Sequence, residues 1–414
     1  NIKYLSNITT TSINLTNLLD DLKNRGAQLV LQQKGEELVK ILKAIQKEIS
    51  VITQATTNDK LYAANNFITA LVAWLDNPEP QHIVILFQNS SEIRPGGGFL
   101  GSYAHLTLKN GGLVSFEVND IYDTDGQLTI NVIPPEPLQA ITTKWGARDA
   151  NWFLNFPTSA SKVIKFLESS RIYQDRNIHF SGVIAINDTV IKDLLYILGP
   201  VGDINAENFL AEVQKDVETK TNKGILKQAT PVIFDRLNNL KSETSKKAII
   251  NLIESKVINK DIMIYFENPV MESFIQTLNV GGEWFVIPNN FLGDYLAVVN
   301  ANVAGGKTDA FIDQKIYLNS EIKSNGIINN QLIIERKNNG NQQSEKWYNT
   351  TNQNFIQIFS PKNTELKSIS VNDEKKIKPP ADYNKLKYIE DPDLKAKNDK
   401  NIFSAWLNIP PGES

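Results

Sequence analysis

Hydrophobic positions near the start of the chain recur at intervals of three and four residues. One such set spans residues 38–52 and a second spans 61–75. This spacing places apolar side chains on one face of a helix, so both segments are predicted to be helical. Asn77-Pro78 ends the second helix, because the residue before a proline disfavours helical backbone. Residues 1–80 are therefore predicted to form a helical N-terminal region.

The pattern changes at residues 83–87, which are all apolar and do not alternate with polar residues. Such a run predicts a strand that is buried on both faces of a sheet. Residues 88–103 then form a predicted strand-end loop that contains Glu92 and Arg94. In α/β sheets ligands bind beyond the carboxyl ends of strands, so we expect these two side chains to face a ligand.

Glycines follow in the same predicted loop. Gly97 and Gly98 have no side chains, which would let backbone N–H groups approach an anionic, phosphate-sized ligand. The alternative is a loop that needs glycine for positive φ angles and in which Glu92 simply pairs with Arg94. Neither the dinucleotide fingerprint nor the P-loop pattern is present, so no nucleotide cofactor is expected.

Alternating segments at 103–108 and 113–118 predict a hairpin with a turn at Asn110-Gly111-Gly112. An acidic loop follows and contains Asn119, Asp123 and Asp125. Asn119 is a predicted ligand-binding residue, and the two aspartates are predicted to bind a divalent metal ion. The spacing does not fit an EF-hand, and a polar turn is the alternative interpretation of this segment.

The next segments alternate between strand and helix. Arg148 and Asp149 precede a helix that is capped near Thr158, and residues 180–187 form a second apolar strand followed by another helix. This order predicts βαβ units. We therefore expect an α/β core domain over residues 81–309, with a helical insertion near 205–280.

A second strand-end glycine loop follows the predicted strand 294–302. Asn302 and Lys307 lie at this loop and are predicted to bind the same ligand as the first loop. Further alternating segments predict a β-sandwich over residues 310–414; they are residues 312–318, 331–336, 355–359 and 403–409. The predicted fold class is therefore α/β, with a helical N-terminal region, a central mixed sheet with flanking helices and a C-terminal β-sandwich.

Composition narrows the classes of function. The chain has 414 residues and a net charge of −3, so it lacks the basic excess of a nucleic-acid-binding protein. It contains no cysteine, which excludes disulfides and thiolate chemistry. The first residue is Asn1, and no apolar run reaches the roughly 20 residues that span a bilayer. The absence of cysteine fits an exported protein, and we expect a membrane anchor in a segment outside this chain.

Several motifs together carry a resemblance to a known family. They are residues 88–103, the Asp-Ile-Tyr-Asp-x-Asp-Gly motif, Arg-Asp-Ala-Asn-Trp at 148–152 with Phe-Pro-Thr at 156–158, and residues 300–309. In these motifs the chain resembles the bacterial envelope proteins of domain-of-unknown-function family 4012. The resemblance spans most of the chain and implies a location at the extracellular face of the cell envelope.

The order of elements in the middle region is also similar to that of the LytR-CpsA-Psr phosphotransferases. Those enzymes move glycopolymers from a polyprenyl-pyrophosphate lipid to peptidoglycan, and they use arginines to hold the pyrophosphate and aspartates to hold magnesium. By position, Arg94 matches an arginine of their strand-end loop. The resemblance implies Mg²⁺ as a cofactor and a polyprenyl-phosphate-linked glycan or a cell-wall glycan as a partner.

Two functions remain open from the sequence. In the first, Arg94, Arg148 and Asp149 are catalytic residues of a divergent glycopolymer phosphotransferase, or bind an anionic, phosphate-linked glycopolymer or lipid carrier. Arginines and a divalent cation would there neutralise the charge on phosphoryl oxygens. In the second, the chain is a non-catalytic cell-surface structural or adhesion protein that binds glycan or protein.

Overall fold

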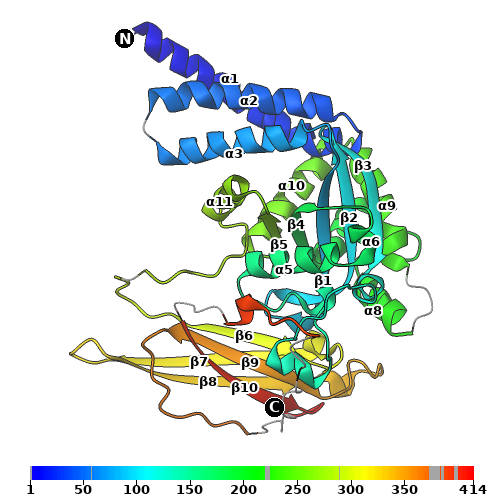
Figure 1. The fold of residues 1–414 in the computed structure, drawn as a ribbon, viewed down its shortest axis with the longest axis vertical. Helices are drawn as coiled ribbons and strands as arrows, with labels where there is room; N and C mark the ends of the chain where they lie inside the picture. The colour runs from blue at the N-terminus through cyan, green and yellow to red at the C-terminus, as the bar shows by residue number, and fades with distance from the viewer. Residues whose placement is uncertain are drawn as a thin grey trace. The chain divides into compact units, whose positions relative to one another are not determined.

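The computed structural model describes residues 2–56, 58–219, 224–288, 290–372, 383, 387–395 and 400–414 (Figure 1). The chain divides into two compact units, each assembled from three stretches. Unit 1 comprises Asn1–Phe87, Gly101–Gly126 and Ser170–Glu283, and unit 2 comprises Gln88–Leu100, Gln127–Ser169 and Trp284–Ser414. These divisions differ from the predicted boundaries at residues 80 and 309.

The N-terminal helical region is confirmed. It consists of α1 (Ile2–Leu31), α2 (Gly35–Ala55) and α3 (Asp59–Leu75), and α2 and α3 lie side by side in Figure 1. The Asn58 side chain accepts hydrogen bonds from the backbone N–H groups of Lys60 and Leu61, which caps α3. The predicted apolar face of α2 is buried, and Ile45 at its centre is 0 % exposed.

A mixed sheet with the strand order β3-β2-β1-β4-β5 forms among the described residues. Its strands are β1 (Gln81–Arg94), β2 (Gly97–Lys109), β3 (Gly112–Asp120), β4 (Phe180–Asn187) and β5 (Ile262–Phe266). The predicted hairpin of β2 and β3 is confirmed, and both Asn110 and Gly111 in its turn have positive φ angles. The sheet therefore has the central position that the sequence predicts.

The prediction of a long loop at residues 88–103 is wrong. β1 continues to Arg94, two residues form a turn, and β2 begins at Gly97, so the segment is a β-hairpin. Its polar residues remain in the strand because they find partners inside the protein. The Gln88 side chain, for example, is 2 % exposed and donates to the Gly96 carbonyl over 2.9 Å.

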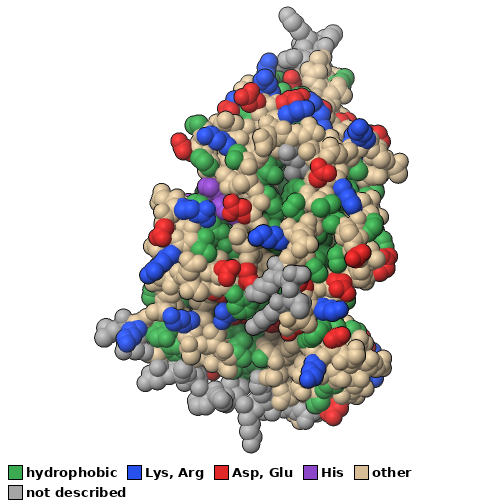
Figure 2. Space-filling view, turned by 90° about the vertical axis from the view of Figure 1, so that its right-hand side faces the viewer, with side chains coloured by type: hydrophobic (Ala, Val, Ile, Leu, Met, Phe, Trp, Pro, Cys, Tyr) green, Lys and Arg blue, Asp and Glu red, His purple; other side chains and the backbone are tan. Residues whose placement is uncertain are grey.

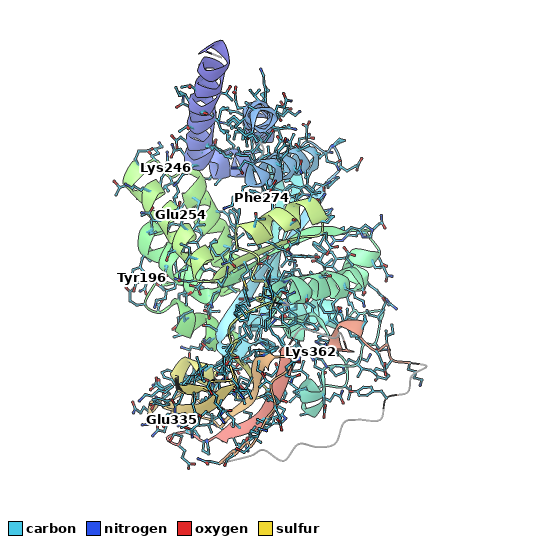
Figure 3. All side chains as sticks on the ribbon, turned by 90° about the vertical axis from the view of Figure 1, so that its left-hand side faces the viewer. Tyr196, Lys246, Glu254, Phe274, Glu335 and Lys362 are labelled. Carbon is cyan, nitrogen blue, oxygen red and sulfur yellow. The ribbon has the colours of Figure 1, made fainter. Side chains whose placement is uncertain are left out.

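Helices accompany the sheet in unit 1. They are α4 (Ile121–Asp125), α6 (Arg171–Gln174), α7 (Asp188–Leu198), α8 (Phe209–Thr219), α9 (Ile225–Asn238), α10 (Glu243–Ile258) and α11 (Pro269–Thr277). The segment 205–280 is not purely helical, because β5 lies within it and pairs antiparallel with β4. Phe274 of α11, labelled in Figure 3, stacks on Phe67 of α3 with ring centroids 4.4 Å apart.

A pair of histidines lies inside unit 1. His82 Nδ1 and His105 Nε2 are 2.9 Å apart, so one of the two nitrogens donates to the other. His105 is 3 % exposed and packs against the rings of Tyr173 and Phe180. Burial, followed by the charges of His82 and Arg176, lowers the pKa of His105 to about 4. This pair is therefore stable as neutral imidazoles.

Antiparallel sheets build the C-terminal part of the chain. The strands are β6 (Ala297–Asn302), β7 (Ile312–Ile322), β8 (Ile328–Asn338), β9 (Asn352–Pro361) and β10 (Lys400–Ile409). Within the described residues they form a β10-β9-β6 sheet and a β7-β8 hairpin. β6 pairs with β9, so it belongs to these sheets and not to the central sheet. In the hairpin, the hydroxyl of Tyr317 donates to Glu335, which Figure 3 labels, over 3.4 Å.

The remaining helices of unit 2 are short, apart from α5. They are η1 (Glu136–Ala140), η2 (Ala147–Asp149), α5 (Phe156–Glu168), η3 (Thr308–Phe311), η4 (Gly340–Gln342) and η5 (Pro392–Lys395). No helix in the described part of the chain has both the length and the apolar character needed to cross a membrane. On the face drawn in Figure 2, basic and acidic side chains are interspersed.

Candidate functional site

Arg94 is the centre of a charged cluster inside unit 2. Its side chain is 1 % exposed and lies at the end of β1. Nη1 donates to the Asn302 carbonyl over 2.5 Å, and Nη2 donates to Glu92 over 3.0 Å and to Asp149 over 3.2 Å. The guanidinium therefore joins three segments that are far apart in the sequence, namely the β1–β2 hairpin, η2 and the end of β6.

Glu92 connects Arg94 to a second cation. Its Oε2 accepts from Lys307 Nζ over 2.5 Å, while its Oε1 contacts Arg94. Burial alone would raise the pKa of Glu92, but the charges of Arg94 and Lys307 outweigh this effect and hold the pKa below its usual value. The ring of Phe99 lies beside both cations, with its centroid 5.1 Å from Arg94 Cζ and 5.4 Å from Lys307 Nζ.

Asp149 and Arg148 form the other side of the cluster. The Asp149 side chain is 3 % exposed, and its two oxygens contact Arg94 over 3.2 Å and Arg148 Nε over 3.3 Å. The backbone carbonyl of Asp149 also accepts from the indole of Trp145 over 3.0 Å, which fixes η2. Arg148 is 26 % exposed in its side chain and is therefore the arginine of this cluster that reaches solvent.

Asn302 holds the loop after β6 in place. It is 0 % exposed, accepts from Gly305 N–H over 2.8 Å and donates to Asp309 over 2.7 Å. Asp309 in turn accepts from Ile93 N–H over 3.1 Å and from Arg336 over 3.2 Å. Sequence reasoning did not select Asp309 or Arg336 as site residues. The position of Asp309, two residues after the predicted site residue Lys307, is a signal that could have identified it. Nothing in the strand pattern around Arg336 distinguishes that arginine.

The glycines of the hairpin have a packing role. Gly97 has a φ of +129°, and a Cβ at this position would lie 2.3 Å from the Gln88 side chain. A Cβ at Gly98 would lie 2.4 Å from the Asn89 carbonyl oxygen. Close approach of protein atoms therefore explains both glycines, as the alternative interpretation of this segment proposed. Binding of an anion by their N–H groups stays a prediction.

The remaining predicted site residues belong to unit 1. The Asn119 side chain on β3 donates to the Glu117 carbonyl over 3.3 Å. Asp123 and Asp125 lie in α4, so the predicted acidic loop is a short helix, which the Asp120 side chain caps by accepting from Tyr122 N–H. No group of three or more His, Asp or Glu side chains in the described stretches is arranged to hold a metal ion. Metal binding by Asp123 and Asp125 stays a prediction.

The structure thus brings together six predicted residues, namely Glu92, Arg94, Arg148, Asp149, Asn302 and Lys307. Opposite charges around Arg94 raise its pKa, although burial acts in the other direction, so the guanidinium stays charged. Buried charges require such partners, because each loses its hydration. The geometry is that of a buried ion-pair network in which Arg94 is already bound to protein oxygens.

The fold and this network define a mixed α/β protein with a buried charged cluster. Residues 78–217 match the model of a family described as "Protein of unknown function (DUF4012)". This match agrees with the resemblance of the motifs in that region. No protein with a curated description matches the chain.

Two solved structures are weakly similar. One is the protein gbs0355 from Streptococcus agalactiae, with 12 % identity, a TM-score of 0.32, and coverage of 51 % of this chain and 75 % of that chain. The other is the transcriptional regulator yvhJ from Bacillus subtilis, with 14 % identity, a TM-score of 0.23, and coverage of 49 % and 96 %. Similarity at this level carries no functional argument.

Proposed function

We propose that this chain is a non-catalytic protein of the bacterial cell envelope that binds cell-wall glycan at its extracellular face. The proposal that the chain is non-catalytic rests on one observation: protein atoms already occupy the hydrogen-bonding positions around Arg94. Its buried guanidinium already contacts Glu92, Asp149 and the Asn302 carbonyl. To take a phosphate it would have to give up protein acceptors at a site with 1 % side-chain exposure. The cluster is therefore better suited to brace unit 2 than to bind a substrate.

A group of exposed aromatic residues in unit 2 is the surface that we propose for glycan. Phe285 is 49 % exposed and Phe291 is 38 % exposed, and their ring centroids are 5.7 Å apart. Phe285 also stacks on Tyr295, with centroids 6.0 Å apart and planes inclined by 16°. Exposed apolar groups that gather in one place mark interaction sites, and flat aromatic faces suit the apolar faces of sugar rings.

Cosedimentation with insoluble cell-wall glycan tests this proposal. We expect Phe285→Ala and Phe291→Ala each to weaken binding by about fivefold or more, the usual effect of truncating an aromatic anchor. Tyr317→Ala is the matched control, because Tyr317 is also 49 % exposed but lies on β7. Wild-type binding in both phenylalanine variants, or an equal loss in the control, would contradict the assigned surface.

A second function is favoured by one observation, the partial exposure of Arg148. Its side chain is 26 % exposed beside the buried cluster, and its guanidinium contacts Asp149 over 3.3 Å and Thr142 over 3.4 Å. It could there contact a polyprenyl-phosphate-linked glycan or lipid carrier, as a divergent glycopolymer phosphotransferase would require. Magnesium binding by Asp123 and Asp125 stays a separate prediction, because these residues belong to unit 1 and Arg148 belongs to unit 2. Two carboxylates hold magnesium only when further oxygen ligands such as water complete its shell, so no catalytic step is derived through the metal.

Incubation with a polyprenyl-pyrophosphate-linked glycan in the presence of Mg²⁺ separates the two functions. The non-catalytic proposal predicts that Arg148→Ala leaves glycan cosedimentation unchanged and that the wild-type chain releases no polyprenyl phosphate from the lipid-linked glycan. If the wild-type chain transfers glycan and Arg148→Ala abolishes the transfer, the phosphotransferase is correct and the non-catalytic proposal is wrong. Protease treatment of intact cells checks the extracellular location.

A further inference from the structure

Lys162 is a buried amine that the proposed function does not use. It lies in α5, on the face that also buries Ser159, Val163 and Phe166, and it is 4 % exposed. Its Nζ is 5.9 Å from the centroid of the Trp145 ring, which packs edge-on against Phe166. A lysine in such surroundings loses most of its hydration and needs protein partners in its place.

Two carboxylates contact this amine. Asp391 Oδ2 is 2.5 Å from Lys162 Nζ, and Asp393 Oδ2 is 2.7 Å from it. The Asp391 side chain is only 1 % exposed, and its other oxygen accepts from Asp393 N–H over 3.0 Å. The Asp393 side chain is 46 % exposed and can exchange protons with solvent. The three groups therefore have different surroundings, with one buried amine, one buried carboxyl and one carboxyl at the surface.

The burial and close contact of Lys162 and Asp391 favour a reaction between them. A buried ion pair costs desolvation energy for both charges, and condensation to a neutral amide removes both charges. Groups held at this distance react with effective concentrations of about 10⁵ M or more when their orientation is right.

We propose that Lys162 and Asp391 become joined by an intramolecular isopeptide bond. Lys162 Nζ attacks Asp391 Cγ, the N–C bond forms, and the bond from Cγ to one carboxyl oxygen breaks. Asp393 takes a proton from the nitrogen and delivers a proton to the leaving hydroxyl, which departs as water. The reaction consumes one amine and one carboxylic acid and releases one water. No oxidation state changes, so no oxidant, reductant or cofactor is required.

The bond would link positions 229 residues apart. It would fasten the segment around η5 to α5. Backbone hydrogen bonds between Ile389 and residues 131 and 133 already hold the same segment at a second point. Covalent closure of so long a segment restricts the unfolded chain strongly. This inference does not depend on the proposed function, because it concerns residues outside both the charged cluster and the aromatic surface.

Mass spectrometry of the purified full chain tests the proposal directly. We expect the denatured wild-type protein to be lighter than its sequence by the mass of one water molecule. We also expect trypsin to release a branched peptide that contains both Lys162 and Asp391. Lys162→Arg and Asp391→Ala should each restore the full mass. A wild-type protein with the full sequence mass, and with separate peptides for the two residues, would overturn the proposal.

Two further measurements examine the mechanism. Asp391→Asn should give the same bond by loss of ammonia. Asp393→Asn should slow bond formation by at least tenfold, and an unchanged rate in this variant would overturn the role of Asp393.

Lys256 is an internal control, because it also contacts two carboxylates, Asp193 over 2.9 Å and Asp261 over 3.1 Å. Those carboxylates are more exposed, at 34 % and 25 %. A second isopeptide bond, formed by Lys256, would contradict the argument that burial drives the reaction.

Discussion

Replacement of Glu92 by glutamine examines the charged cluster most directly. Glu92→Gln keeps the shape of the side chain and removes the carboxylate that contacts both Arg94 and Lys307. Arg94 retains Asp149 at 3.2 Å, whereas Lys307 loses the carboxylate oxygen at 2.5 Å. Removal of one partner from a buried ion pair typically costs about 3–5 kcal/mol. The glutamine oxygen can still accept one hydrogen bond, so we expect a loss of about 3 kcal/mol in the free energy of unfolding.

Tryptophan fluorescence during urea denaturation is the assay. Of the six tryptophans, all but Trp74 belong to unit 2, so their emission reports the unfolding of the unit that contains the cluster. Glu365→Gln is the matched control, because Glu365 pairs with Lys367 while both side chains are at least 75 % exposed. We expect this control to change the free energy of unfolding by less than about 0.5 kcal/mol.

The pH dependence provides a second check on the same variant. The pKa of Glu92 in the fold is below its ordinary value of 4.5, so its carboxylate stabilises the folded state above that pH. This contribution is lost as the pH falls through the lowered pKa. The difference between wild type and Glu92→Gln should therefore be largest near about pH 7 and should shrink below about pH 4. A difference under about 1 kcal/mol at neutral pH, or one that does not shrink in acid, would refute the ionic reasoning.

Two other predictions concern residues whose environment is equally specific. Burial lowers the pKa of His105 to about 4, so the fold favours its neutral form. Unit 1 should lose about 2 kcal/mol of stability as the pH falls from about 7 to about 5. Far-UV circular dichroism should show this loss, and His105→Gln should lack most of it. Gly97→Ala should destabilise unit 2 by about 2–3 kcal/mol, since a Cβ there would meet the Gln88 side chain and φ is positive. Gly326→Ala is the control, because φ is also positive there but an added Cβ would have no atom within 4 Å. It should lower the free energy of unfolding by only about 1 kcal/mol, measured by tryptophan fluorescence. Equal losses in the two alanine variants would contradict the steric argument.

The sequence predicts helices and strands that have a strong hydrophobic periodicity, but it does not show which other elements they pack against. The apolar faces of α2 and α3 and the alternation in β9 and β10 identify these elements, because each pattern reflects burial on one face. The hairpin at Glu92 and Arg94 was predicted as a loop, since polar residues and glycines are typical of loops. The segment remains in strands because distant segments supply its partners: Asn302 and Asp149 accept from Arg94, and Asn151 donates to the Gly98 carbonyl.

The same limit applies to the cluster. The residue types and the strand ends predict that Arg94, Asp149 and Lys307 lie close together, and they do. Their burial depends on tertiary contacts, and burial changes the interpretation of the cluster from an open anion site to an occupied ion-pair network. Arg336 illustrates this point, because one arginine in an exposed hairpin pattern gives no sign that its partner will be Asp309.

Neither unit is one continuous length of polypeptide, and this has a consequence for biogenesis. During translation, unit 1 has all of its residues once Glu283 has left the ribosome, while unit 2 must wait for β10, whose Ile409 carbonyl accepts from Asn338 over 3.0 Å. The nascent chain therefore carries Arg94 and Glu92 for some two hundred residues before Lys307 and Asn302 are synthesised. Assembly that depends on such distant partners is slow, so the emerging hairpin is a segment on which a chaperone would act.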